Sequence, residues 1–216
     1  KILLFFHNDP LKMKGSKHKS DRQILLNQCE KILCVSEYIK NQFLIGINAK
    51  KEKVEVIYNG INRQQKKFPK KNKEILYVGK IAKDKGTHLY VNAIKSLYRN
   101  HKDWKFILIG TEQNSKNIDY KNYSNQVKDN FISIGKQAKL EMHLSYEKVH
   151  ERMKTASVVV VPSIWKEPYG LVVAEAMSNG AAVLASNVGG IPEIIKKNGI
   201  LIDEIDSKKI KNNLIE

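Results

Sequence analysis

The stretch WKEPYGLVVAEAM runs from Trp165 to Met177 and holds the clearest succession of turn and helix in the chain. It follows an apolar, β-branched run from Val158 to Val161, which has the length of a buried strand. From Leu171 to Ser178 the pattern predicts a helix. This order leaves the free N–H groups of residues 169–172 at the carboxyl edge of a sheet. Such a helix start binds phosphate well, and Gly170 would let a ligand approach the backbone closely.

Two glutamates frame this turn: Glu167 precedes the helix, and Glu175 lies about one turn inside it. The bare spacing is common, and two glutamates at a helix start can simply be solvated charges that the helix dipole favours. With Pro-Tyr-Gly and Glu-Ala-Met in place, however, the stretch resembles the E-x7-E motif of retaining family 4 glycosyltransferases, which have the GT-B fold. The resemblance implies that Glu167 contacts the donor sugar and Glu175 holds the ribose hydroxyls. The backbone of Tyr169, Gly170 and Leu171 would cradle the diphosphate.

Length and composition allow one or two globular domains, with 216 residues of which 42% are hydrophobic. No apolar run approaches the 18 or so residues of a membrane span. The chain begins in a strand-like run without an initiator methionine and stops within a helix-like stretch, so we expect a fragment of a longer protein. Cys29 and Cys34 form a C-x4-C pair without a second pair, which is poor evidence for zinc. Free thiols are expected, with Cys34 buried.

The net charge of +16 favours anionic partners or reflects a solvated lysine surface. Lysines are spread along the chain and are not interleaved with aromatic residues, so no nucleic-acid partner is expected. A local cluster of Lys12, Lys14, Lys17 and Lys19 motivates the hypothesis of a peripheral contact with an anionic membrane face.

The first part of the chain resembles the end of the N-terminal domain of family 4 enzymes. A strand at residues 2–6 precedes His7, and a second strand at residues 31–35 leads to Ser36, which would cap a helix over residues 37–44. By this resemblance His7 matches a histidine near the transferring sugar. A lone histidine is more often a structural hydrogen-bonding residue, but loops that follow strands carry sites in such sheets. The glycine-rich loop of the family lies upstream of the residues present here.

The domain boundary is expected near Asn59-Gly60, a strong turn signal. We predict the end of an N-terminal domain at residues 1–58, a linker at 59–73 and a nearly complete C-terminal domain at 74–216. Alternating apolar strands and helices predict an α/β fold with parallel sheets covered on both faces. The resemblance to family 4 implies that this fold is of the GT-B type, with Rossmann-like sheets.

A loop with two cations follows the apolar strand at residues 75–78. The segment from Gly79 to Gly86 resembles the G-R…K-G element of the family, whose cations neutralise the donor diphosphate. Lys80 and Lys85 take these positions, although Lys80 replaces the usual arginine and loses its bidentate fork. The alternative is two exposed lysines in a loop.

Two further segments extend the resemblance. Residues 131–136 resemble the strand whose exit loop meets the nucleobase, which places Lys136 among the donor-binding residues. The segment from Gly189 to Glu193 resembles the G-G-x-x-E loop beside the donor phosphate and sugar.

The function implied by the resemblance is transfer of a sugar from a UDP- or GDP-linked donor to an acceptor hydroxyl, with retention of configuration. It implies no metal and no cofactor, and a sugar or lipid-linked acceptor in bacterial polysaccharide, lipopolysaccharide or glycolipid synthesis. The expected location is the cytoplasm, at the inner face of the membrane if the lysine cluster binds there. The alternative is a non-catalytic fragment that binds a nucleotide-sugar. The predicted catalytic residues are His7 and Glu167. The predicted donor-binding residues are Gly79, Lys80, Lys85, Lys136, Glu167, Tyr169, Gly170, Leu171, Glu175, Gly189 and Gly190.

Overall fold

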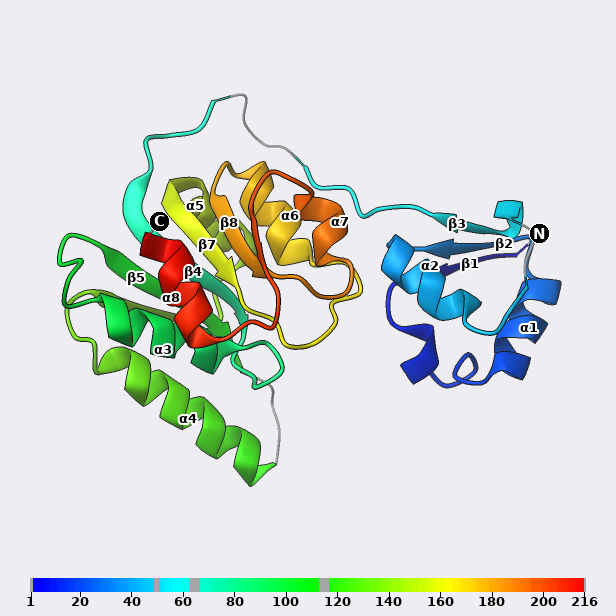
Figure 1. The fold of residues 1–216 in the computed structure, drawn as a ribbon, viewed down its shortest axis with the longest axis horizontal. Coiled ribbons are helices and arrows are strands. Elements are labelled where there is room, and N and C mark those ends of the chain that lie inside the picture. Colours follow the sequence, from blue (N-terminus) through cyan, green and yellow to red (C-terminus); the bar gives the residue numbers. More distant parts are fainter. Residues whose placement is uncertain (1, 49–50, 63–66, 113–116, 216) are drawn as a thin grey trace. The chain divides into compact units, whose positions relative to one another are not determined.

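The computed structural model describes residues 2–48, 51–62, 67–112 and 117–215, which form two compact units (Figure 1). The smaller unit consists of Lys1–Gly60, Lys166–Leu171 and Gly189–Ile194. The larger unit consists of Ile61–Trp165, Val172–Val188 and Ile195–Glu216.

The smaller unit contains a parallel sheet with the strand order β1-β2-β3. Its elements are β1 (Leu3–Phe6), the 3₁₀ turn η1 (Pro10–Lys12), α1 (Lys19–Gln28), β2 (Lys31–Cys34), α2 (Glu37–Leu44), η2 (Lys51–Lys53) and β3 (Val54–Val56). Helix α2 begins directly after Ser36, whose hydroxyl accepts a hydrogen bond from the backbone N–H of Ile39 at 3.1 Å. The predicted capped helix over residues 37–44 is therefore confirmed.

A buried arginine holds the helices of this unit together. Arg22, on α1, is only 2% exposed, and its guanidinium donates to the carbonyl oxygens of Phe43 and Ile45 at 2.8 and 2.7 Å. It also donates to the carbonyls of Ser16 and Lys17 at 3.1 and 2.9 Å. Because Phe43 and Ile45 lie at the end of α2, one fixed cation neutralises the negative end of that helix dipole.

The larger unit contains a wholly parallel sheet with the strand order β6-β5-β4-β7-β8-β9. Its strands are β4 (Asn72–Lys80), β5 (Lys105–Thr111), β6 (Ala138–Met142), β7 (Ala156–Val161), β8 (Ala182–Ser186) and β9 (Ile200–Ile202). The chain thus builds outward from β4 in one direction and then restarts at β7 in the other. This is the order of a doubly wound sheet, so the predicted α/β fold with parallel sheets is confirmed.

Helices cover this sheet and supply its core (Figure 1). They are α3 (Thr87–Leu97), α4 (Ile118–Ile132), α5 (Tyr146–Thr155), α6 (Leu171–Ser178) and α8 (Ser207–Ile215). Helix α7 (Ile191–Ile195) belongs to the smaller unit except for its last residue. Helix α3 contributes Tyr90, Ile94 and Leu97 to the main apolar cluster, together with Phe131 of α4 and Ile210 of α8. The apolar face of this amphipathic helix is therefore buried.

One predicted strand is wrong. Residues 131–136 were expected to form a strand, but α4 extends through Ile132, and the strand at this position in the fold is β6 at Ala138–Met142. The apolar residues Val127, Phe131 and Ile134 are buried while Ile132 is 55% exposed. Val127 and Phe131 lie four residues apart on the buried face of α4, and Ile134 is buried just beyond the end of the helix, so the helical spacing outweighs the apparent strand pattern.

Candidate functional site

The carboxyl ends of β4 and β7 mark the point at which the strand order of the larger sheet reverses. In open parallel sheets, ligands bind at this reversal point because the two following loops diverge and leave room between them. Strand β4 ends at Lys80 and the loop that follows it carries Lys85, while the loop after β7 begins at Pro162 and leads toward Glu167. The sheet topology therefore places the predicted lysine loop beside the start of the WKEPYG stretch.

Direct backbone contacts join these two loops. The carbonyl oxygen of Asp84 accepts hydrogen bonds from the N–H groups of Ile164 and Trp165, at 2.8 and 2.9 Å. Gly86 closes the lysine loop with φ +67°, and a Cβ atom built there would lie 1.8 Å from the carbonyl oxygen of Pro162. Only glycine permits this approach, so the backbone between Lys80 and Gly86 is held against the exit of β7.

Two buried hydroxyl groups hold the backbone of Lys80 in place. The hydroxyl of Tyr77, on β4, donates to the carbonyl oxygen of Lys80 at 2.8 Å and pairs with the hydroxyl of Thr87 at 2.8 Å. Thr87 is fully buried and also lies 3.2 Å from the same carbonyl. Sequence reasoning missed both residues. The available signal was a tyrosine inside an apolar strand, since a buried tyrosine must find a partner for its hydroxyl.

Glu175 lies on α6, half-buried between solvent and the body of the larger unit. Burial raises the pKa of its carboxyl above the ordinary value of 4.5, while nearby His150 acts in the opposite direction. The imidazole Nε2 of His150 lies 3.9 Å from Oε1 of Glu175, which is too long for a hydrogen bond. A carboxylate held in this way, with one side toward water, can accept hydrogen bonds from a ligand that carries hydroxyl groups.

Replacing Glu175 with glutamine should increase the stability of the protein at neutral pH. Because the folded-state pKa is raised, the wild-type protein loses stability as pH rises from 4.5 through that pKa. The Glu175→Gln variant lacks this titration, so its free energy of unfolding should exceed that of the wild type more at pH 7 than at pH 4. Denaturant unfolding at the two pH values measures the difference.

Glu147 provides the control for this prediction. It is exposed, and hydrogen bonds, first from its own backbone N–H and then from Ser145, lower the pKa of its carboxyl. Its contribution to stability is therefore lost as pH falls, and Glu147→Gln should show the opposite dependence on pH. An advantage of Glu175→Gln that is the same at pH 4 and pH 7 would contradict the assigned burial effect.

In the smaller unit, the two glycines of the predicted G-G-x-x-E loop pack against the backbone beside Glu167. Gly189 has φ +58°, and a Cβ atom there would lie 2.2 Å from the carbonyl oxygen of Glu167. The N–H of Gly190 donates to the same oxygen at 2.8 Å. Close backbone packing thus explains both glycines, and their role toward a donor stays a prediction.

The segment that contains Glu167 makes further contacts within the smaller unit. The hydroxyl of Ser36 donates to the carbonyl of Pro168 at 2.5 Å, and the phenol of Tyr169 donates to the carbonyl of Asn59 at 3.1 Å. Glu193 accepts hydrogen bonds from the N–H groups of residues 37 and 38 at 2.7 and 2.8 Å. Glu193 therefore uses its carboxylate to cap α2, where a negative charge is favoured.

Two other predicted donor-binding residues, Gly170 and Leu171, lie at the start of α6. Gly170 has φ +105°, a backbone conformation that favours glycine, and Leu171 is the first residue of the helix and is 46% exposed. His7 follows β1 and is exposed, and its ring packs at a tilt of 53° against the ring of Phe5, with 4.1 Å between centroids. The contacts of His7 are those of a surface residue, and its catalytic role stays a prediction.

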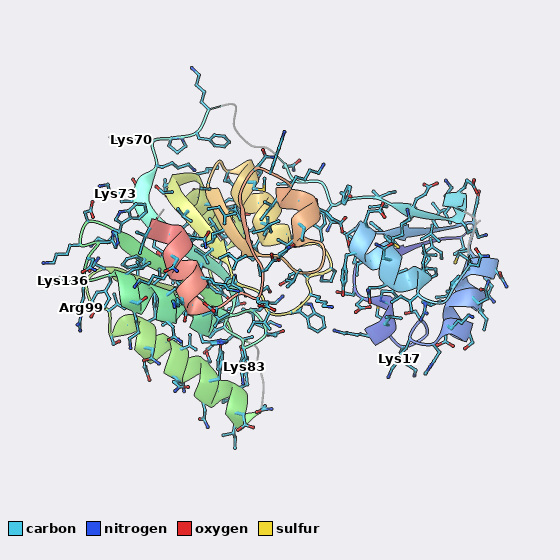
Figure 2. All side chains as sticks on the ribbon, viewed as in Figure 1. Lys17, Lys70, Lys73, Lys83, Arg99 and Lys136 are labelled. Atoms are coloured by element: carbon cyan, nitrogen blue, oxygen red, sulfur yellow. The ribbon has the colours of Figure 1, made fainter. Side chains whose placement is uncertain are left out.

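Lys136 does not lie where the sequence suggested. It precedes β6 instead of following it, so it belongs to the amino edge of the sheet, whereas ligand loops follow the carboxyl edge. Its carbonyl accepts a hydrogen bond at 3.1 Å from Lys105, at the start of β5. Figure 2 shows Lys136 well separated from Lys83, which lies in the loop after β4. The assignment of Lys136 to the nucleobase loop is therefore wrong. The loop that leaves β6 begins only after Met142.

Other ligand classes find little support in the part of the chain that the structure describes. Within it, no group of three or more histidine, cysteine, aspartate or glutamate residues is arranged to hold a metal ion. Cys29 and Cys34 are free and buried, and burial raises the pKa of the Cys34 thiol to about 12, so it is unreactive. No helix among the described residues is both long enough and apolar enough to cross a bilayer.

Comparisons with known proteins agree on one family. Residues 59–216 match the model for "Glycosyl transferases group 1", and residues 1–65 match the model for "Glycosyltransferase Family 4". An uncharacterized glycosyltransferase of Methanocaldococcus jannaschii is 31% identical over all of this chain and 57% of its own length. The lipopolysaccharide 1,2-N-acetylglucosaminetransferase of Salmonella typhimurium is 33% identical over 62% of the chain and 35% of its own length. The chain thus spans roughly a third to a little over half of these relatives.

Among solved structures, the Anabaena protein HepE in complex with UDP has a TM-score of 0.80 at 19% identity, over 99% of this chain and 61% of that one. A similarity at this level of identity concerns the fold. The match to the group 1 model covers the whole described lysine loop, α6 and the segment from Gly189 to Glu193. The chain therefore belongs to the group 1 family of glycosyl transferases.

Proposed function

We propose that this chain binds a nucleotide-sugar donor and takes part in transferring its sugar to an acceptor hydroxyl, with retention of configuration as in family 4. The observation that carries the proposal is the pair of hydrogen-bonded loops at the reversal point of the larger sheet. One of these loops presents Lys80 and Lys85, and the other leads into the helix that carries Glu175. A diphosphate needs cations, and a ribose needs a hydrogen-bond acceptor.

The chemical requirement of this reaction is neutralisation of charge on the departing diphosphate. Lys80 is exposed and Lys85 is partly buried, and their loop is fixed by Asp84 and Gly86, so their backbone needs little reorganisation when a ligand binds. Preorganised positive charge stabilises a leaving group more effectively than mobile charge. In this proposal the leaving phosphate helps to deprotonate the acceptor hydroxyl, Glu167 contacts the sugar and His7 lies near the transferred group.

The donor is proposed to be linked to UDP or GDP. Two of the solved structures that resemble this chain are both of HepE, one with UDP and glucose and one with UDP-glucose, and they support a uridine-linked donor. The Salmonella relative supports an acceptor in lipopolysaccharide synthesis. The exposed side chains of Lys14, Lys17 and Lys19 support a peripheral contact with an anionic membrane face.

Calorimetry with UDP, GDP and ADP tests the donor assignment. The diphosphate that binds best should lose about 10- to 100-fold in affinity for the Glu175→Ala variant, because hydrogen bonds between hydroxyls and a carboxylate contribute roughly 1.5–3 kcal/mol. The matched control is Glu204→Ala, since Glu204 belongs to the same unit and its side chain is 95% exposed. Its affinity should equal that of the wild type.

Two results would contradict the proposal. If none of the three diphosphates bound, the nucleotide-sugar assignment would fail; if Glu175→Ala bound as tightly as wild type, Glu175 would be removed from the site. A sugar-transfer assay with radiolabelled donor then separates enzyme from binding module. Binding without any transfer would favour the alternative, a chain that holds a nucleotide-sugar without turnover.

A further inference from the structure

A buried histidine lies beneath Glu175, and no sequence motif pointed to it. His150, on α5, is 3% exposed, and its Nδ1 lies 2.9 Å from the side-chain amide nitrogen of Asn179. Its other ring nitrogen, Nε2, is buried and has no hydrogen-bond partner among the described residues. The nearest charged oxygen is Oε1 of Glu175, at 3.9 Å. A buried polar atom left in this way is costly unless a partner reaches it in the working protein.

The contacts of Asn179 identify which nitrogen of His150 carries the proton. The amide nitrogen of Asn179 donates to the backbone carbonyl of Glu175 at 2.8 Å, and a carbonyl can only accept. This bond fixes the orientation of the Asn179 amide, so its second N–H points to Nδ1 of His150. Nδ1 is then the acceptor, and the neutral imidazole holds its proton on Nε2, the atom that faces Glu175.

The ends of the two helices next to His150 are held together by a lysine. The ammonium group of Lys71 donates to the carbonyl of Lys154 at 2.8 Å and to that of Asn179 at 2.9 Å. These carbonyls lie at the ends of α5 and α6, so one cation ties together the helices that carry His150 and Glu175. The ring of Tyr146 packs against that of His150 at an angle of 45°, with 4.2 Å between centroids. His150 therefore has little freedom, and the Glu175 carboxylate is the partner that can move.

We infer that His150 is a positioning residue for Glu175: its Nε2–H hydrogen-bonds one carboxylate oxygen and leaves the other oxygen directed toward the donor's ribose hydroxyls. A carboxylate movement of about 1 Å brings the 3.9 Å separation into hydrogen-bond range. The ribose hydroxyls and the Nε2–H of His150 then donate to the same Glu175 carboxylate. Each hydrogen bond holds the carboxylate in the orientation that the other requires. This inference rests on the proposed function, because it assumes that Glu175 binds the ribose.

The test compares a nucleoside diphosphate with its 2′,3′-dideoxy analogue. The probe is whichever of UDP, GDP and ADP binds best, together with the dideoxy form of the same compound. For the wild type, the analogue should bind about 10- to 100-fold more weakly, because it lacks the hydroxyls that Glu175 accepts. For His150→Phe, which keeps a ring against Tyr146, that ratio should fall by about 3- to 10-fold while affinity for the dideoxy analogue stays the same.

The possible outcomes distinguish the ribose-binding role of Glu175 from the positioning role of His150. A wild-type ratio near one would remove the ribose from Glu175 and with it the role of His150. A wild-type preference that survives in His150→Phe would overturn the positioning role alone, as would an equal loss of affinity for both compounds, which is the result of a purely structural role. His101→Phe is the matched control, since His101 lies between α3 and β5, outside this cluster, and its ratio should equal that of the wild type.

A second measurement does not depend on the substitution. Long-range ¹H–¹⁵N correlation spectra of the wild-type chain at a pH where the imidazole is neutral should show the proton of His150 on Nε2. A proton on Nδ1 would contradict the network and overturn the inference. Asn179→Ala, which removes the donor to Nδ1, should weaken the preference for Nε2 and reduce the ribose preference in the same direction as His150→Phe, even if the phenylalanine variant fails to fold.

Discussion

Replacing Gly86 with alanine is expected to lower the free energy of unfolding by about 3–5 kcal/mol. The new Cβ would lie 1.8 Å from the carbonyl oxygen of Pro162, and φ at this position is +67°. The obstacle is backbone, which cannot turn aside as a flexible side chain can. The loops after β4 and β7 would have to separate, and the two hydrogen bonds to Asp84 would stretch. Denaturant unfolding measures the loss.

Gly135 provides the matched control for Gly86. It has φ +83°, and a Cβ atom there would meet nothing within 4 Å. Gly135→Ala should therefore cost only the backbone strain, about 1–2 kcal/mol. The difference between the two variants isolates the steric overlap. Equal losses would mean that the approach between Gly86 and Pro162 does not constrain the loop, and Lys85 would then lose its fixed support.

Replacing Arg22 with methionine is expected to destabilise the smaller unit by about 3–5 kcal/mol, because it removes a buried charge with its hydrogen bonds and leaves several buried carbonyls without a donor. Methionine keeps much of the apolar stem, so the loss reports the guanidinium. Hydrogen exchange followed by mass spectrometry should show faster exchange in β1 and β2, whose fold depends on the packing of α1 and α2. The strands β4 and β5 should keep their protection.

Arg99 is the control for Arg22, since it is an exposed arginine whose guanidinium contacts only the neighbouring Tyr98 among the contacts described (Figure 2). Arg99→Met should change stability by less than about 0.5 kcal/mol. If Arg22→Met were equally mild, the four carbonyl contacts of Arg22 would contribute little, and another feature would have to hold α1 against the end of α2.

Helices with local signals at their ends could be predicted from the sequence residue by residue. Ser36 caps α2 through a hydrogen bond three residues away, and the Pro-Tyr-Gly turn fixes the start of α6 at Leu171. Both devices act within a few positions of the chain, so the sequence contains all the information that they need. The strands β4 and β7 could be recognised from the sequence because each contains a short continuous apolar run.

The edge of the larger sheet was harder to predict. Strand β6 alternates Ala138, Leu140 and Met142 toward the core with Lys139 and Glu141, which pair with each other at 2.7 Å. Charged residues are typical of an edge strand, yet they conceal its apolar content. The segment at residues 131–136 therefore shows a stronger strand pattern than β6 does, and the prediction misplaces Lys136 with it.

The site was predictable only where motifs recur in the family. The sequence indicated Lys80, Lys85 and Glu175, and the structure gives the first two a loop at the reversal point of the sheet. It could not indicate His150, because 25 residues separate it from Glu175 and no local pattern joins α5 to α6. Contacts of this kind depend on how two helices pack on a sheet, which one sequence does not specify.

The position of β4 has a consequence for how the protein is made. On one side of β4, Asn72 pairs with Ala156 of β7. During synthesis this side of β4 stays unpaired until 84 further residues have been made. Until then, an apolar strand with unpaired N–H and C=O groups is open to other chains. The close contact between Gly86 and Pro162 can likewise form only after β7 has been synthesised.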